Sequence, residues 1–246
     1  MCRKNGGDRS GDNLIVYSDD SAHCFACQYH EMGPAAKVAK IKAIREKDEA
    51  GTTDKGVPLP EDAVTIFTGP PRNWLMQYGI TSEEILKHRF VWSESRQLLI
   101  YPVYEDDEIV FWCGRNFANS GKKYHTEGRL THHLPIIFNV SAENPTTEIV
   151  IVEDIVSAIK VSRVCDAMAI FSGGITLKPA ARLSTLYERL IIWGDADKQR
   201  ENMRKRANYQ SLYKYGTGCI LTKNDPKAYS VEDIARFVSQ QGHTPL

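Results

Sequence analysis

The pattern of apolar and polar positions changes twice along the chain. Residues 98–103 and 109–113 have strand-like patterns and flank an acidic stretch at 105–108, which predicts a β-hairpin. After residue 145 the pattern consists of short, wholly apolar runs, as in strands that are buried on both faces of a parallel sheet. These runs lie at 149–152, 168–171, 190–193 and 219–222, with helix-compatible stretches at 155–163, 178–189 and 198–214. Strands that alternate with helices in this way predict a helix-covered α/β sheet.

Two short helices are expected ahead of the hairpin. Apolar residues recur at helical spacing over 74–78 and again at 85–86, and the intervening residues 79–81 break the pattern. Thr81 or Ser82 is expected to cap the second helix, because a hydroxyl oxygen can accept a hydrogen bond from a backbone N–H group in its first turn.

Changes in composition divide the chain into four segments. They are a small polar β module at 1–33, a basic helix and linker at 34–57, a mixed helix and hairpin region at 58–145, and the parallel-sheet region at 146–246. We therefore expect an α/β protein, of α+β type overall, preceded by a small β module.

Charge and composition narrow the class of protein only slightly. The 246 residues include 31 Lys and Arg residues and 31 Asp and Glu residues, so the formal net charge is zero. A surface that binds a polyanion must therefore be a local patch. No apolar run approaches the length of about 20 residues that spans a bilayer, and no signal peptide is recognised, which predicts a cytoplasmic protein without membrane contacts. Six cysteines with a single CxxC pair indicate metal ligands and reduced thiols rather than a disulfide framework.

Carboxylates follow two of the apolar runs. Glu153 comes directly after 149–152, and Asp195 and Asp197 follow 190–193. The carboxyl edge of a parallel sheet is where ligands bind, and an extended chain would direct Asp195 and Asp197 to the same side. Such an oxygen-rich site suits Mg²⁺. The alternative is a set of solvated acids at loop starts, but two such elements in series favour the metal site.

These elements resemble the TOPRIM module that primases, topoisomerases and related nucleases share. The resemblance rests on a strand ending in Glu153-Asp154, a helix and strand, Gly173-Gly174, and the strand before Asp195-Ala196-Asp197. Upstream, the CxxC module, the basic linker, the hairpin leading to Arg115 and the lysines after Gly121 resemble the primase half of phage primase-helicases. Two positions depart from the usual pattern, since Asp154 replaces a Gly and Ser157 stands where the family often carries Asp.

The resemblance implies a DNA primase, a nucleotidyltransferase that makes short RNA primers on single-stranded DNA. It implies that Asp225 is a further catalytic carboxylate beside Glu153, Asp195 and Asp197, which would bind Mg²⁺ or Mn²⁺. It also implies that the ribonucleoside triphosphate and the primer are held by three basic residues, Arg115, Lys122 and Lys123. The alternative for Lys122 and Lys123 is that they are a pair of solvated loop lysines. Segment 58–145 would then be the N-terminal subdomain of the RNA-polymerase core, and 146–246 the TOPRIM subdomain with a C-terminal helix.

The printed sequence contains no P-loop motif GxxxxGK[ST], so a separate replicative helicase is the expected partner. If a phage encodes the protein, it would act in the host cytoplasm. Two rival functions remain. One is a TOPRIM-type nuclease, which uses similar carboxylates to cleave DNA, and the other is a non-catalytic single-stranded-DNA-binding replication factor.

The amino-terminal cysteines predict a zinc site with an unusual ligand count. Cys24 and Cys27 have the spacing of a zinc knuckle, and Cys2 is the third thiol, whereas a structural zinc site needs four ligands. Three interpretations stay open: residues missing before Met1, His23 or His30 as the fourth ligand, or a decayed site. By resemblance, this zinc-ribbon-like module would recognise the template.

Overall fold

Three separate β-sheets organise the part of the chain that the computed structural model describes. That part comprises residues 14–18, 22–24, 30–31, 56–105, 107–118, 121–128, 136–137, 146–171 and 177–241. The chain divides into two units, Met1–Thr52 and Thr53–Leu246. The first unit ends inside the segment that the sequence predicts as basic helix and linker.

The first unit contains a small antiparallel sheet. Its strands are β1 (Leu14–Val16), β2 (Ala22–Cys24) and β3 (His30–Glu31), in the order β1-β2-β3. His23 pairs with His30 across β2 and β3. Cys2 and Cys27 and the basic helix expected within 34–57 lie outside the described residues. The predicted zinc site therefore stays a prediction.

The second unit begins with a helical pair and a four-stranded antiparallel sheet. The elements are α2 (Pro70–Gln77), α3 (Ser82–Lys87), β4 (Val91–Ser93), β5 (Leu98–Glu105), β6 (Glu108–Asn116) and β7 (Tyr124–Gly128), with the strands in sequence order. The predicted hairpin is confirmed as β5 and β6. The predicted cap is confirmed too, because the Thr81 hydroxyl accepts from the Glu84 N–H and the Glu84 carboxylate accepts from the Thr81 N–H.

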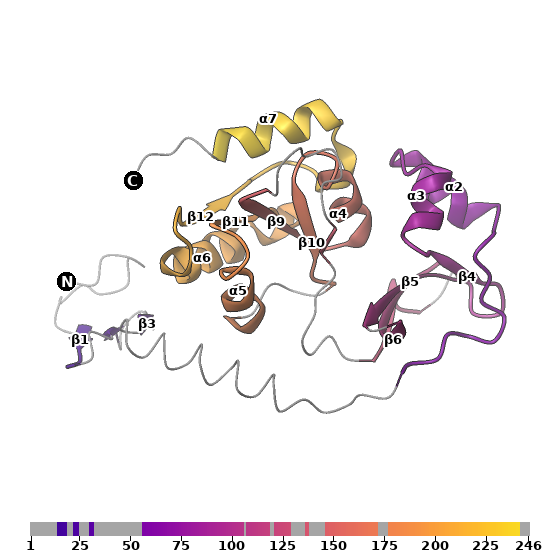
Figure 1. Cartoon of the computed structure of the whole chain (residues 1–246), viewed down its shortest axis with the longest axis horizontal. Helices are drawn as coiled ribbons and strands as arrows, with labels where there is room; N and C mark the ends of the chain where they lie inside the picture. Colours follow the sequence, from indigo (N-terminus) through magenta and orange to yellow (C-terminus); the bar gives the residue numbers. More distant parts are fainter. Residues whose placement is uncertain are drawn as a thin grey trace. The chain divides into compact units, whose positions relative to one another are not determined.

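A five-stranded sheet follows, with the order β12-β11-β9-β10-β8. Its elements are β8 (Ile136–Ile137), β9 (Glu148–Val152), α4 (Ile155–Val161), β10 (Asp166–Ala169), α5 (Leu177–Leu183), β11 (Arg189–Ile192), the 3₁₀ helix η1 (Ala196–Lys198), α6 (Gln199–Tyr209), η2 (Gln210–Leu212), β12 (Thr217–Cys219), η3 (Pro226–Ala228) and α7 (Val231–Gln241). β9 to β12 are parallel (Figure 1). β8 pairs antiparallel with β10. The predicted α/β sheet is confirmed, with β10 and β12 each starting two residues earlier than the apolar runs indicate.

Helices cover both faces of this sheet because its strands are apolar on both sides. Val150 and Val152 of β9 pack into a core cluster that includes residues of α4 and α7. Ile149 and Ile151, which alternate with them, pack with residues of α5 and α6 on the other face. All four side chains are fully buried, which is worth about 1.5–3 kcal/mol for each of them.

The four-stranded and five-stranded sheets share one hydrophobic core. The ring of Phe171, just after β10, lies 5.9 Å from Tyr101 of β5 and 5.5 Å from Phe111 of β6, measured between ring centroids. An ion pair of 2.7 Å between Arg163, after α4, and Glu84 of α3 adds a polar link. The two sheets are thereby held in contact within the second unit.

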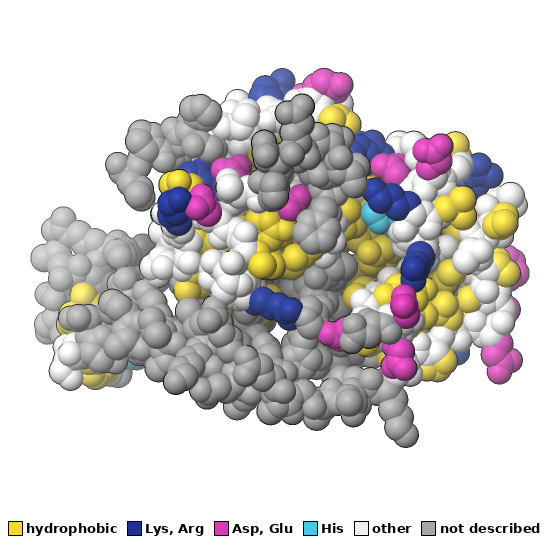
Figure 2. All heavy atoms as spheres, viewed as in Figure 1, with side chains coloured by type: hydrophobic (Ala, Val, Ile, Leu, Met, Phe, Trp, Pro, Cys, Tyr) yellow, Lys and Arg dark blue, Asp and Glu magenta, His cyan; other side chains and the backbone are white. Residues whose placement is uncertain are grey.

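The surface of the described residues carries mixed charge, as the balanced composition indicates. On the face that Figure 2 shows, basic and acidic side chains are interspersed. No helix in the described ranges is both long enough and apolar enough to cross a membrane.

Candidate active site

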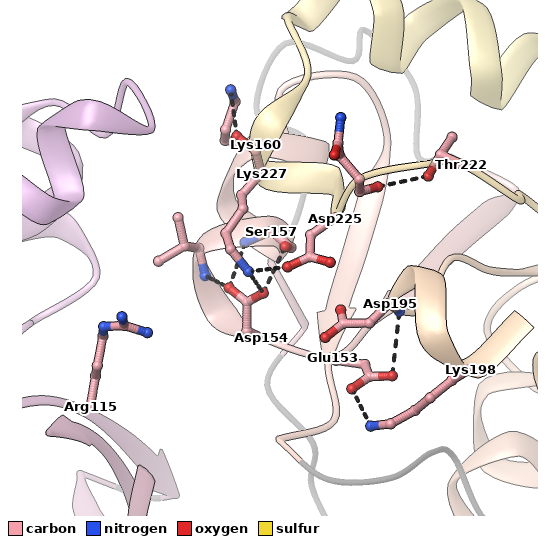
Figure 3. A network of polar contacts seen from close by, with 12 residues as sticks. Arg115, Glu153, Asp154, Ser157, Lys160, Asp195, Lys198, Thr222, Asp225 and Lys227 are labelled. Carbon is pink, nitrogen blue, oxygen red and sulfur yellow. Dashed lines mark hydrogen bonds and ion pairs between the residues drawn. The ribbon is translucent and has the colours of Figure 1, made fainter. Parts of the chain in front are cut away.

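The carboxylates predicted from the sequence come from neighbouring parallel strands. Glu153 follows β9 and Asp195 follows β11, the strand paired with β9. Asp225 lies beyond β12, which pairs with β11 on its other side. Because parallel strands end at one edge of the sheet, the chain brings the three side chains to the same region (Figure 3).

Asp195 experiences the combined negative charge of this region. Its pKa is raised from 3.8 to about 6, first by burial and then by the charges of Glu153 and Asp225, with a smaller contribution from Asp154. Lys227 opposes the rise. The carboxylate of Asp195 is therefore in a place where an added cation is favoured.

Asp197 does not have the geometry that the sequence predicts. The expectation of an extended chain from Asp195 to Asp197 is wrong, because residues 196–198 form the 3₁₀ helix η1. The side chain of Asp197 is exposed. The alternation of an extended strand thus gives no reason for both carboxylates to face one side, and a metal-binding role for Asp197 stays a prediction.

Lys198 forms an ion pair with Glu153 that the sequence does not reveal. The Lys198 Nζ lies 2.6 Å from Glu153 Oε2, and this hydrogen bond raises the pKa of the lysine. Among the described residues, the other oxygen of Glu153 accepts only a long contact of 3.4 Å from the backbone N–H of Asp195. One side of the Glu153 carboxylate is thus left weakly engaged.

Asp154, which comes directly before α4, caps this helix. Its Oδ1 accepts hydrogen bonds of 3.0 Å from the N–H groups of Val156 and Ser157, and its Oδ2 accepts one of 2.8 Å from the Ser157 hydroxyl. Lys227 completes the set, with its Nζ 2.8 Å from Asp154 Oδ2 and 2.8 Å from Asp225 Oδ2 (Figure 3). An Asp directly before a predicted helix is a recognisable capping signal, but nothing in the sequence points to Lys227.

Arg115 lies near the end of β6 against an aromatic group. Its guanidinium is 4.3 Å from the ring centroid of Trp74, and its Nη1 donates to the Tyr124 hydroxyl at 3.2 Å. Its Nε is buried and has no hydrogen-bond partner among the described residues. Burial and the charge of Asp154 raise the pKa of Tyr124, so the Arg115–Tyr124 pair lies within electrostatic reach of the carboxylate region.

Lys122 and Lys123 are exposed at the turn that leads into β7. The backbone of this turn is fixed, because Asn116 donates from its side chain to the Lys122 carbonyl at 3.0 Å and from its backbone to the Lys123 carbonyl at 2.9 Å. The Lys123 ammonium lies 5.5 Å from the Tyr124 ring. No ion pair to either lysine is found in the described residues, and their role in holding nucleotide stays a prediction.

The donor set suits a magnesium ion that is shared with a substrate. In the described residues, no three His, Cys, Asp or Glu side chains form a metal-binding group by themselves. Mg²⁺ does not require one, because it binds one or two carboxylates and completes its shell with water and substrate phosphates. Glu153 and Asp195 provide such oxygens, and the pKa of Asp195 is raised first by burial and then by neighbouring negative charge, which a cation would offset.

Solved structures with a similar fold are DNA primases. The zinc-binding and RNA polymerase domains of the Aquifex aeolicus primase match with a TM-score of 0.55 at 12% identity, over 94% of this chain and 75% of that one. The primase fragment of the bacteriophage T7 primase-helicase protein matches with 0.51 at 13%, over 95% of both chains.

The E. coli primase catalytic core matches with a TM-score of 0.54 at 12% identity, over 69% of this chain and 71% of that one. No protein-family model and no curated protein sequence matches the chain. The resemblance to DNA primases that the sequence motifs indicate is thus borne out in three dimensions, and the chain has the fold of these bacterial and phage primases.

Proposed function

We propose that this chain is a DNA primase that makes short RNA primers on single-stranded DNA. The observation that carries the proposal is the grouping of Glu153, Asp195 and Asp225 at one edge of the parallel sheet, in a chain with a primase fold. The antiparallel four-stranded sheet, which shares a hydrophobic core with the five-stranded sheet, contributes Arg115, whose guanidinium lies over the Trp74 ring. Together these features provide the two things that nucleotidyl transfer requires, a cation site and positive charge for a triphosphate.

The reaction joins the primer 3′-hydroxyl to the α-phosphate of a ribonucleoside triphosphate and releases pyrophosphate. Bound Mg²⁺ or Mn²⁺ would lower the pKa of the attacking hydroxyl and neutralise charge on the departing pyrophosphate. Glu153 and Asp195 would hold the cation, with Asp225 adjacent and Asp197 as a further candidate. Glu153 and Asp195 lie just beyond the paired strands β9 and β11, so the backbone pairing supports the relative position of these two carboxylates.

The basic residues would hold the phosphates of the incoming nucleotide. Arg115 is the best supported, because stacking on Trp74 orients its planar guanidinium and leaves the Nε without a partner among the described residues. Lys122 and Lys123 would add positive charge from the exposed turn. Contacts that stabilise the bound substrate and the transition state equally should change the Michaelis constant more than kcat.

The remaining parts of the proposal concern partners. Single-stranded DNA would be the template, and the amino-terminal module, with Zn²⁺ held by Cys2, Cys24, Cys27 and His23 or His30, would recognise it. The T7 relative is part of a primase-helicase, so a replicative helicase is the proposed protein partner. Such a protein would act in the cytoplasm, where bacterial and phage DNA is replicated.

The test is an incubation of the full chain with single-stranded DNA, labelled ribonucleotides and Mg²⁺. We expect oligoribonucleotides whose synthesis depends on both DNA and metal and disappears in Asp195→Asn. Shortened DNA would indicate a nuclease instead. Retention of DNA without any new product would indicate a binding factor, and either result would contradict the proposal.

A further inference from the structure

An ammonium group already occupies part of the carboxylate region. Lys227 Nζ lies 2.8 Å from Asp154 Oδ2 and 2.8 Å from Asp225 Oδ2, so it bridges carboxylates that follow two different strands of the sheet. Only 13% of its side chain is exposed. Figure 3 shows the amine between the two acids, on the opposite side of Asp195 from Lys198.

The backbone that carries Lys227 is held from within the protein. Lys160 of α4 is 8% exposed, and its Nζ donates to the Lys227 carbonyl at 3.0 Å and to the Tyr229 carbonyl. Pro226, the first residue of η3, is buried. Lys227 is therefore held at its backbone carbonyl as well as at its ammonium group, unlike a solvated surface lysine.

Asp154 has no oxygen position left for a metal ion. A carboxylate offers about four lone-pair sites, and those of Asp154 accept from two backbone N–H groups, the Ser157 hydroxyl and Lys227. Ser157 thus binds Asp154 at the helix position where the family often has a carboxylate. In this half of the region one ammonium, that of Lys227, contacts both carboxylates, Asp154 and Asp225.

In the other half, which contains Glu153 and Asp195, the ammonium of Lys198 contacts Glu153 but no donor in the described residues contacts the Asp195 carboxylate. From donors in the described ranges, Glu153 accepts one short hydrogen bond, from Lys198, and a long one from the Asp195 backbone. Within the described part of the chain, no donor reaches the carboxylate oxygens of Asp195. A divalent cation can therefore be accommodated beside Glu153 and Asp195 without displacing Lys227.

We propose that Lys227 is a built-in cation: its ammonium fills the position between Asp154 and Asp225 that a second divalent ion would otherwise take. The chain then binds one divalent cation, at Glu153 and Asp195, and the lysine supplies the second positive charge. The inference deepens the proposed function and rests on it for its catalytic meaning, but cation binding tests it without any primer synthesis.

The experiment is a titration of the full chain with Mn²⁺, in which electron paramagnetic resonance measures the free ion. We expect one Mn²⁺ per wild-type chain, lost in Asp195→Asn. The substitution Lys227→Met roughly keeps the length of the side chain and removes its charge. The variant protein should bind a second Mn²⁺ or bind the first at least tenfold more tightly than the wild type. Lys223→Met is the matched control, because this exposed lysine on the same loop carries the same formal charge. It should leave the titration unchanged.

Each result decides the question. Two Mn²⁺ ions of similar affinity in the wild-type chain would overturn the inference whether or not Lys227→Met folds, as would a Lys227→Met titration within twofold of the wild type. These results would leave the proposed function intact. Primer synthesis that fails alongside normal Mn²⁺ titrations would overturn the function and leave the cation assignment standing. Absence of Mn²⁺ binding in every protein would overturn the lysine inference and the metal chemistry of the proposed function together.

Discussion

Asp195→Asn should abolish metal-dependent synthesis and yet stabilise the folded protein. The pKa of Asp195 is raised from 3.8 to about 6, first by burial and then by neighbouring carboxylates. A rise of this size corresponds to about 3 kcal/mol, and screening by water at a partly exposed side chain reduces it to about 1.5 kcal/mol. For a chain of this length the predicted gain in Tm is about 3–6 °C at pH 7.5 without divalent cations.

The pH dependence of this gain follows from the direction of the shift. The folded state holds the Asp195 proton more tightly than the unfolded state, so the penalty is absent below about pH 4, develops between pH 4 and 6, and is complete above pH 6. The difference in Tm between variant and wild type should follow that course.

The assay is thermal unfolding of both proteins from pH 4 to 8 in EDTA and then in Mg²⁺. Mg²⁺ should raise the wild-type Tm and leave that of Asp195→Asn unchanged, since the variant lacks a ligand. Asp197→Asn is the control in EDTA, where its exposed side chain predicts little change in Tm. A variant that is less stable than the wild type at pH 7.5, or a gain that persists at pH 4, would refute the reasoning.

Three further predictions concern residues around the site. Thr81→Ala removes the cap of α3 and should lower the free energy of unfolding by about 1 kcal/mol without affecting primer synthesis. Unfolding and primer assays check this, and an unchanged free energy of unfolding would mean that the cap contributes nothing. Arg115→Ala should raise the Michaelis constant for ribonucleotides about tenfold or more, and Arg115→Lys should restore it only in part because an ammonium lacks the planar, stacked fork; full rescue by Lys would argue against that geometry. Lys122→Ala and Lys123→Ala should each raise the same constant about threefold. Unchanged kinetics in the double variant would identify the pair as solvated loop residues.

The apolar runs predict the parallel sheet well because its strands are buried on both faces. Residues 149–152 have no polar member, and all of them lie in the core. The run at 219–222 misplaces its strand, because Thr217 and Gly218 pair with β11 although neither is strongly apolar. Register in a sheet is set by the neighbouring strand as well as by the hydrophobicity of the segment.

The candidate site also has one part that the sequence reveals and another that it does not. Glu153 and Asp195 could be found because each ends an apolar run, and the topology of a parallel sheet brings such ends together. The lysines could not be found, since the contact of Lys198 with Glu153 spans 45 positions and that of Lys227 with Asp154 spans 73. A single lysine carries no periodicity, so only the folded chain shows which acid it meets.

The strand β8 bears on how this protein can be divided into fragments. Ile136 and Ile137 precede residue 146, where the parallel-sheet region was expected to begin, yet they pair with β10 in that sheet. A fragment that starts at residue 146 would lack this strand and leave the backbone of β10 unpaired along one side. An open edge of this kind can pair with a second molecule, so such a fragment is predicted to self-associate, and one that starts before residue 136 is not.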